Sequence, residues 1–333
     1  MRIGIIGATG YTGFELIKIL SRHKNVKISA VTSDTSAGKK ISEIYPYLSN
    51  ICENELLPNN FEQIQEIVDV VFLCLPHGAS QEAAKYFFEK GKLVIDLSAD
   101  FRITDATLYE SVYKTKHNAV DVLANSVYGI PELFAEKIKG SKMIANPGCY
   151  PTSVILPLYP LLKDNLIEKN MIVADSKSGV SGAGKTPSAK THFCETNEDF
   201  KPYGIFSHRH NPEIDFILSD ASPQTHVIFT PHLLPVNRGI ESTIYLKKNC
   251  NFSLKNVLMD FYKDSFFVRI RKDDSIPSIK DVAMTNFVDI NIFENGKNVI
   301  IVSCIDNLIK GASGQAVQNM NIALGFDEKE GLL

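Results

Sequence analysis

The chain has 333 residues, of which 44% are apolar and 22% are charged. These fractions are typical of a globular protein of about two domains and exclude long disordered or collagen-like segments. The 35 Lys and Arg residues against 38 Asp and Glu give a net charge of −3, which leaves no basic excess for binding nucleic acid.

The first third of the chain alternates short apolar runs with helix-like segments. A helix is predicted over residues 79–90 and another after the first strand, and strands are predicted at residues 3–6, 26–31, 70–75 and 93–96. This alternation predicts an α/β fold built on a Rossmann-like, doubly wound parallel sheet.

The pattern changes near residue 150. A helix from Thr152 onward precedes predicted strands at residues 171–176, 226–235, 239–247, 285–293 and 298–304. The last two strands are separated by Asn295-Gly296, a strong hairpin signal. Pro157 and Pro160 should kink the helix or end it early. This half is predicted to be an α+β domain with a mostly antiparallel sheet, followed by a final helix over about residues 310–324.

A glycine-rich turn directly follows the first strand and opens the first helix. Its spacing, Gly-x-x-Gly-x-x-Gly, departs from the strict dinucleotide fingerprint, but glycines at such a turn let the backbone approach a pyrophosphate at a helix N-terminus. An ordinary strand-to-helix turn is the alternative. We predict that the turn binds the cofactor through Gly7, Thr9, Gly10, Tyr11, Thr12 and Gly13.

Cys149 lies between a predicted strand end and a predicted helix whose first turn contains Pro151. A helix N-terminus lowers the pKa of a thiol and favours the thiolate, so Cys149 is a candidate nucleophile. A small buried side chain is the alternative, and the residue type taken alone favours it, because that is the commonest role of a free cysteine.

His208 and His210 are candidate acid/base residues. In an extended segment both point to the same side, and both precede a predicted helix, for which Asn211 is a suitable N-cap and Pro212 a suitable first residue. Two solvated loop histidines are the alternative. Metal ligation together with His192 and Cys194 matches no common zinc spacing, so no metal is predicted.

Two further segments carry polar groups suited to a ligand. Arg102 follows a parallel strand's carboxyl end, where it can grip a phosphate or carboxylate, or pair with a neighbouring aspartate on the surface. Residues 179–186 match the phosphate-loop pattern letter by letter, yet Pro187 follows and no crossover helix is evident, so the match is interpreted as chance.

Five motifs occur in the order typical of one family. They are Gly7-Ala8-Thr9-Gly10-Tyr11-Thr12-Gly13, Leu97-Ser98-Ala99-Asp100-Phe101-Arg102, Asn146-Pro147-Gly148-Cys149-Tyr150-Pro151-Thr152, His208-Arg209-His210-Asn211-Pro212-Glu213-Ile214 and Asp306-Asn307-Leu308-Ile309-Lys310-Gly311-Ala312. Through these motifs the chain closely resembles the N-acetyl-gamma-glutamyl-phosphate reductase family, the arginine-pathway relatives of aspartate-semialdehyde dehydrogenase, from Met1 to about Phe326.

The resemblance implies NADPH-dependent reduction of N-acetyl-glutamyl 5-phosphate to the 5-semialdehyde through a thioester on Cys149, with His208 as acid/base. It also implies that the final helix returns to the nucleotide domain. The expected domains are residues 1–147 with 305–333 for NADP binding, and residues 148–304 for catalysis and dimerisation. A homodimer or homotetramer in the cytoplasm is expected. The expected substrate-binding residues are Arg102, His210, Ser178, Gly179 and Lys185.

The cofactor loop departs from the family, because Asp34 stands where these reductases often have an arginine for the 2′-phosphate of NADP. An acid there commonly holds the free ribose of NAD. If Asp34 turns outward, neighbouring hydroxyls and lysines can bind the phosphate, so NADP with relaxed selectivity is expected. The remaining predicted cofactor-binding residues are Ser33, Ser36, Lys39, Pro76 and Asn307.

Other functions remain compatible with the residues. Another acyl-phosphate or semialdehyde dehydrogenase of the same superfamily is one, and a non-catalytic NADP-binding regulator is a second. Tyr86/Lys90 and Tyr159/Lys163 also supply the Tyr-x-x-x-Lys pair of short-chain reductases, although a large β-rich second half does not suit that class.

Two remaining features agree with a cytoplasmic protein. The longest apolar run near the start, residues 70–75, is far below the ~20 residues of a membrane span. No Cys-x-x-Cys occurs, so free thiols are expected.

Overall fold

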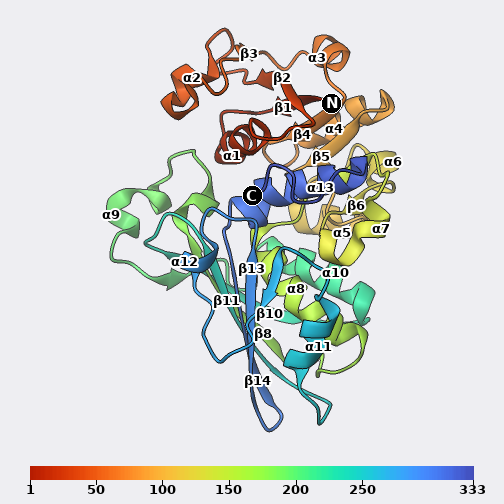
Figure 1. The fold of residues 1–333 in the computed structure, drawn as a ribbon, viewed down its shortest axis with the longest axis vertical. Helices are drawn as coiled ribbons and strands as arrows, with labels where there is room; N and C mark the ends of the chain where they lie inside the picture. Colours follow the sequence, from red (N-terminus) through yellow and green to blue (C-terminus); the bar gives the residue numbers. More distant parts are fainter. The chain divides into compact units, whose positions relative to one another are not determined.

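The computed structural model describes residues 1–333, which divide into two compact units, residues 1–147 with 312–333 and residues 148–311 (Figure 1). The second unit therefore includes residues 305–311, which the sequence prediction assigned to the nucleotide domain. No helix is both long and apolar enough to cross a membrane.

The first unit is built on a seven-stranded sheet in which every pair of neighbouring strands is parallel. The strand order is β3-β2-β1-β4-β5-β7-β6. The strands are β1 Arg2–Ile6, β2 Lys27–Thr32, β3 Leu56–Leu57, β4 Val70–Leu73, β5 Leu93–Asp96, β6 Val127–Tyr128 and β7 Met143–Ala145.

Both faces of this sheet are covered, because consecutive residues of a strand point to opposite faces and residues 3–6 of β1 and 70–73 of β4 are all buried. On one side α13 packs against α1, α7 and β5, whereas α4 contacts β4, β5, α3 and α6. The predicted doubly wound parallel sheet is confirmed. The helices are α1 Tyr11–Leu20, α2 Ile41–Ile44, η1 Pro46–Leu48, α3 Phe61–Ile67, α4 Ser80–Glu89, α5 Ala106–Tyr113, α6 Val120–Leu123, α7 Pro131–Ile138 and α13 Gly314–Leu324.

The second unit contains a mixed seven-stranded sheet in the order β12-β13-β14-β11-β8-β10-β9. Four strand pairs are antiparallel, and β8/β10 and β12/β13 are parallel. The hairpin predicted at Asn295-Gly296 joins β13 to β14, with Gly296 at φ +60°. The strands are β8 Ile172–Gly179, β9 Lys201–Pro202, β10 Val227–Leu234, β11 Ile240–Lys247, β12 Val268–Ile270, β13 Val288–Asn295 and β14 Asn298–Ile305.

One face of this sheet is packed by α8, α10 and α11. The helical segments of the unit are α8 Cys149–Lys163, η2 Val180–Ala183, η3 Ala189–Thr191, α9 Phe193–Thr196, α10 His210–Ala221, α11 Leu254–Phe261 and α12 Ile279–Val282. A π-helical turn, η4 Ile309–Ser313, precedes α13, so the last helix begins later than residue 310.

The predicted early end of α8 is wrong, because the helix runs through both prolines to Lys163. A proline at position 160 cannot donate to the carbonyl of Leu156. That carbonyl accepts the hydroxyl of Tyr262 instead. Every residue from Tyr150 to Leu162 is buried, so tertiary packing compensates for the missing backbone donors.

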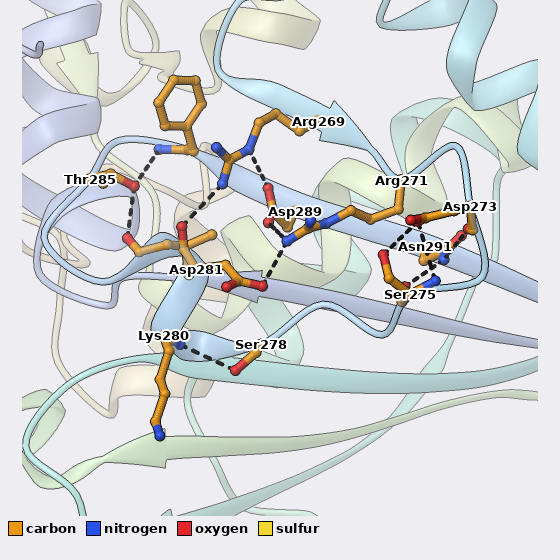
Figure 2. A network of polar contacts seen from close by, with 12 residues as sticks. Arg269, Arg271, Asp273, Ser275, Ser278, Lys280, Asp281, Thr285, Asp289 and Asn291 are labelled. Carbon is orange, nitrogen blue, oxygen red and sulfur yellow. Dashed lines mark hydrogen bonds and ion pairs between the residues drawn. The ribbon is translucent and has the colours of Figure 1, made fainter.

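A polar network ties the edge of the second sheet together (Figure 2). The fully buried carboxylate of Asp289 on β13 forms ion pairs with Arg269 and Arg271, and Arg271 also pairs with Asp281 of α12. Asn291 donates to backbone carbonyls in the loop after β12, at Asp273 and Ser275. A buried charge is stable only when it is paired, and two guanidinium groups meet that requirement here.

Candidate active site

A cavity of about 940 Å³ lies in the second unit and brings several predicted residues together. Its lining includes the predicted residues Cys149, Ser178, Gly179, His208 and His210. Lys190, Lys201 and Arg209 add positive charge to the wall, opposed by Glu195. The predicted Lys185 is exposed and lies outside this lining.

Cys149 is the first residue of α8, with Gly148 as the N-cap. Unpaired backbone N–H groups and the helix dipole favour the thiolate at this position. The π-helical turn passes directly over the cysteine, since a Cβ built on Gly311 would lie 2.7 Å from the Cβ of Cys149. Only glycine permits this approach.

Glu213 on α10 is a buried residue for which the sequence offered no role. Its Oε1 accepts the backbone N–H of Gly148 at 2.8 Å, so it holds the N-cap that precedes Cys149. The sequence feature that could have pointed to Glu213 is a carboxylate on a largely apolar helix face, five residues after His208. A buried carboxylate requires such a partner.

His208 is held by hydrogen bonding and by aromatic side chains. Its Nδ1 accepts the backbone N–H of His210 at 3.1 Å, and the rings of Tyr150, Tyr203 and Phe229 surround it edge to face. Burial, and secondarily the charge of Arg209, lowers the pKa of His208 to about 4. The imidazole is therefore neutral near pH 7, and because Nδ1 is an acceptor, the proton is on Nε2.

The helix that follows begins two residues earlier than predicted. His210 is its first residue, so Asn211 lies inside α10 rather than capping it, and its side chain donates to the carbonyl of Val227. The rings of His208 and His210 are 4.9 Å apart, centroid to centroid, which agrees with their predicted common side.

Two tyrosines connect the histidines to the sheet. Tyr150 packs against both histidine rings and donates its hydroxyl to the carbonyl of His232 at 3.0 Å. Tyr203 donates to the hydroxyl of Tyr150 at 3.3 Å. Sequence reasoning missed both tyrosines, because a single aromatic residue beside a motif gives no directional signal.

In the first unit, the glycine turn lies where the strand order reverses, between β1 and β4. Gly7 has φ +82°, and a Cβ there would lie 2.7 Å from the carbonyl oxygen of Cys74. A Cβ on Gly13 would lie 2.6 Å from the carbonyl oxygen of Ala8. No side chain caps the N-terminus of α1. The turn is thus open backbone that fits a pyrophosphate.

Hydrogen bonds in the loop after β2 determine the direction of the Asp34 carboxylate. Both carboxylate oxygens of Asp34 accept from Asn59, one from its backbone N–H at 2.9 Å and one from its side-chain amide at 2.7 Å. Asn59 in turn accepts from Thr32, whose hydroxyl accepts from Gly7. Ser33 lies 3.3 Å from the Thr9 hydroxyl, Lys39 is exposed, and Ser36 is half-buried.

The other predicted residues are engaged within their own units. Arg102 is buried, and its Nε and a terminal nitrogen donate to the carbonyls of Asn146 and Leu97. The side chain of Asn307 accepts from Gly239 and donates to Ser181. Pro76 is exposed in the loop after β4. Their contacts with substrate or cofactor remain predictions.

Comparison with known families gives two matches that together span most of the chain. The description "Semialdehyde dehydrogenase, NAD binding domain" matches residues 2–141, and "Semialdehyde dehydrogenase, dimerisation domain" matches residues 149–307. With the glycine turn, the first match makes the first unit a nicotinamide-cofactor domain.

The chain is similar along its whole length to curated bacterial proteins. It is 47% identical to N-acetyl-gamma-glutamyl-phosphate reductase of Desulforapulum autotrophicum, covering 100% of this chain and 98% of the relative. It is also 47% identical to the protein of that name from Pelotomaculum thermopropionicum, covering 100% and 97%.

Solved structures of lower identity share the fold. Aspartate semialdehyde dehydrogenase II of Vibrio cholerae, complexed with ASA, has a TM-score of 0.74 at 19% identity over 96% of this chain and 97% of that one. Aspartate semialdehyde dehydrogenase of Candida albicans, with NADP, has a TM-score of 0.70 at 17% identity over 96% and 97%.

Proposed function

This chain belongs to the N-acetyl-gamma-glutamyl-phosphate reductase family of oxidoreductases, and from that premise we propose a specific reaction. The reaction is NADPH-dependent reduction of N-acetyl-L-glutamyl 5-phosphate to N-acetyl-L-glutamate 5-semialdehyde, with release of phosphate, in arginine biosynthesis. The observation that carries the proposal is the position of Cys149, at a helix N-terminus in the wall of a cavity that also contains His208.

The Cys149 thiolate adds to the acyl-phosphate carbonyl, the C–O bond to phosphate breaks, and a thioester remains on the sulfur. When bound, the reduced nicotinamide cofactor supplies the hydride that reduces this thioester. The resulting thiohemiacetal oxyanion expels the sulfur, which releases the aldehyde and restores the thiolate. The departing phosphate takes up the one proton that the overall reaction consumes.

His208 is proposed to stabilise the oxygen of both tetrahedral species by donating its Nε2–H. The tautomer supports this role, because Nδ1 is already an acceptor for the His210 N–H and Nε2 carries the proton. A preorganised donor in a partly desolvated site is worth several kcal/mol to a developing oxyanion, about 3–4 when a single donor is removed. His210 is proposed to position the substrate.

NADP is the proposed cofactor. The bonds between Asp34 and Asn59 occupy both carboxylate oxygens, which directs the acid to the loop rather than to a ribose hydroxyl. Ser33, Ser36 and Lys39 are then the groups proposed for the 2′-phosphate. The glycine turn, with Thr9, Tyr11 and Thr12, is proposed to hold the pyrophosphate.

The substrate is proposed to place its phosphate at Arg102 and its acyl chain near Ser178, Gly179 and Lys185. Arg102 suits an oxyanion because a guanidinium offers several donors in a planar fork. Ser178 and Gly179 border the cavity that contains Cys149, which supports a position beside the reacting carbonyl.

A homo-oligomer is proposed, with the face of the second sheet opposite α8, α10 and α11 as the interface between copies. Strand register places Ile228, Val173, Tyr245, Ile300 and Phe293 in one row across five strands. Ile228, Tyr245 and Ile300 are about 40% exposed, at 38%, 43% and 39%. An apolar row of this kind is typical of a protein interface.

The cytoplasm is the proposed location, since its reducing conditions preserve the Cys149 thiol.

The decisive experiment is the reverse reaction: phosphate-dependent reduction of NADP by N-acetyl-glutamate semialdehyde. Iodoacetamide should label Cys149 first and abolish turnover, and Cys149→Ser should fail to form the thioester detected by mass spectrometry. The exposed Cys194 is the matched control, because Cys194→Ser should leave activity unchanged. Labelling at Cys194 with loss of activity, or turnover by Cys149→Ser, would reject the proposal.

A further inference from the structure

A buried polar cluster in the first unit takes no part in the reaction described above. Its centre is Asp100, which is completely buried behind the carboxyl end of β5. Its carboxylate accepts the Tyr109 hydroxyl at 2.8 Å and the backbone N–H of Gly78, at 2.9 Å from each oxygen. Burying a carboxylate costs free energy unless hydrogen-bond donors surround it. The buried Asp100 carboxylate therefore requires the donors from Tyr109 and Gly78.

Other buried groups fix the cluster in place. Gln81 on α4 donates to the Tyr109 hydroxyl at 3.0 Å and accepts the Asn118 N–H at 2.7 Å. His117 contacts the Asp100 carbonyl through Nε2 at 2.9 Å, and its Nδ1 accepts from Ala119. Tyr109, Gln81 and His117 are each at most 3% exposed. The carboxylate therefore has little freedom to move.

The backbone that Asp100 grips is the loop between β4 and α4. Gly78 has φ +82°, and the adjacent His77 accepts the Ala99 N–H at Nδ1, so the loop is attached at two consecutive residues. This loop starts at Cys74, whose carbonyl touches Gly7 of the glycine turn. The strand order reverses between β1 and β4, which is where open parallel sheets bind their ligands.

We propose that Asp100 is a positioning residue that presets the loop of residues 74–79 to receive the nicotinamide half of the cofactor. The inference rests on the proposed function in so far as the first unit binds a nicotinamide dinucleotide. Arg102, two residues further on, donates to the carbonyl of Asn146. Asp100 and Arg102 thus belong to one short segment that fixes two loops: Asp100 holds the loop after β4, and Arg102 holds the loop after β7.

The test compares Asp100→Asn and Tyr109→Phe with Tyr159→Phe. Tyr159 donates to Asp220 at 2.8 Å in the second unit, so its variant removes the same kind of bond far along the chain from the loop. Dissociation constants are measured for NADPH and for adenosine 2′,5′-bisphosphate, which lacks the nicotinamide half, and thermal melting reports stability.

We expect the NADPH dissociation constant to rise at least tenfold in Asp100→Asn and about threefold in Tyr109→Phe. The bisphosphate constant should stay within twofold, and Tyr159→Phe should change neither constant. Equal weakening of both ligands, or lower melting temperatures with unchanged NADPH affinity, would overturn the proposal. If Asp100→Asn does not fold, Tyr109→Phe against Tyr159→Phe decides. Binding is measured without acyl phosphate, so a failure of the proposed reaction is recorded separately.

Discussion

Replacing His208 by glutamine separates two roles that a histidine can take beside a reactive cysteine. A general base must accept a proton, which glutamine cannot do, whereas an oxyanion donor needs only an N–H at the position of Nε2. The amide nitrogen of glutamine reaches that position, and the shorter asparagine places its nitrogen closer to Nδ1. The structure predicts that His208→Gln retains much of the activity and that His208→Asn and His208→Ala lose it.

The expected loss of kcat follows from the environment of the His208 imidazole. A pKa of about 4 against an ordinary 6.5 corresponds to about 3 kcal/mol against the charged imidazolium. At pH 7 about one molecule in a thousand carries that charge, so the cationic form of His208 is too rare to serve as the resting proton donor. Loss of a neutral oxyanion donor costs about 3–4 kcal/mol, or roughly 10²–10³ in kcat.

The assay is kcat and kcat/KM for the three variants, with the pH dependence of the wild type between pH 5 and 8. We expect His208→Gln within about tenfold of wild type and the other two reduced by roughly 10²–10³. The wild-type profile should show no inflection from His208 in this interval. A His208→Gln variant as inactive as His208→Ala would refute the donor role and restore the acid/base role implied by the family resemblance.

Three further predictions concern residues around the two sites. Glu213→Ala should lower kcat by roughly 10-fold or more and slow alkylation of Cys149, because the Gly148 N–H loses its acceptor. Glu213→Gln retains an acceptor, so its kcat should fall less, and equal losses of kcat in the two variants would contradict this reasoning. Asn59→Ala should raise KM for NADPH more than KM for NADH, because it removes the side-chain amide that holds one oxygen of the Asp34 carboxylate and leaves only the backbone N–H bond; an unchanged ratio would show that Asp34 has no part in selectivity. Burial, then the charge of Asp100, raises the pKa of the fully buried Asp96 to about 6, so the native state favours the protonated acid and stability falls as pH rises from about 4 to 6. Asp96→Asn should therefore gain about 2 kcal/mol on wild type in unfolding free energy between pH 4 and pH 7, and a constant difference would disprove the shift.

Several features could be predicted from the sequence because they depend on neighbours along the chain. The glycine turn follows a buried strand at the position where only small residues tolerate the contact between Gly7 and Cys74. The hairpin at Gly296 follows from its need for positive φ. Cys149 at the start of α8 follows from the strand before it and Pro151 after it. The predicted family is confirmed by relatives that match the whole chain.

Features that depend on distant partners could not be predicted. Asp34 was ambiguous until its bonds to Asn59, a residue from another loop, were known. The continuity of α8 past Pro160 could not be predicted, because the released carbonyl of Leu156 is satisfied by Tyr262, which is remote in sequence. Glu213 and Asp100 were visible as letters within motifs, but their partners Gly148 and Gly78 are defined only by the tertiary structure.

The return of the chain to its first unit determines the order in which the protein can be completed during translation. Helix α13 packs on α1, α7 and β5, and its residues Ala316, Val317 and Met320 are fully buried. Until α13 has emerged from the ribosome, the surfaces of the sheet unit that it covers stay exposed, whereas the second unit is contiguous and can close beforehand. A chain truncated before residue 314 would thus contain every residue of the second unit and lack the helix that completes the cofactor domain.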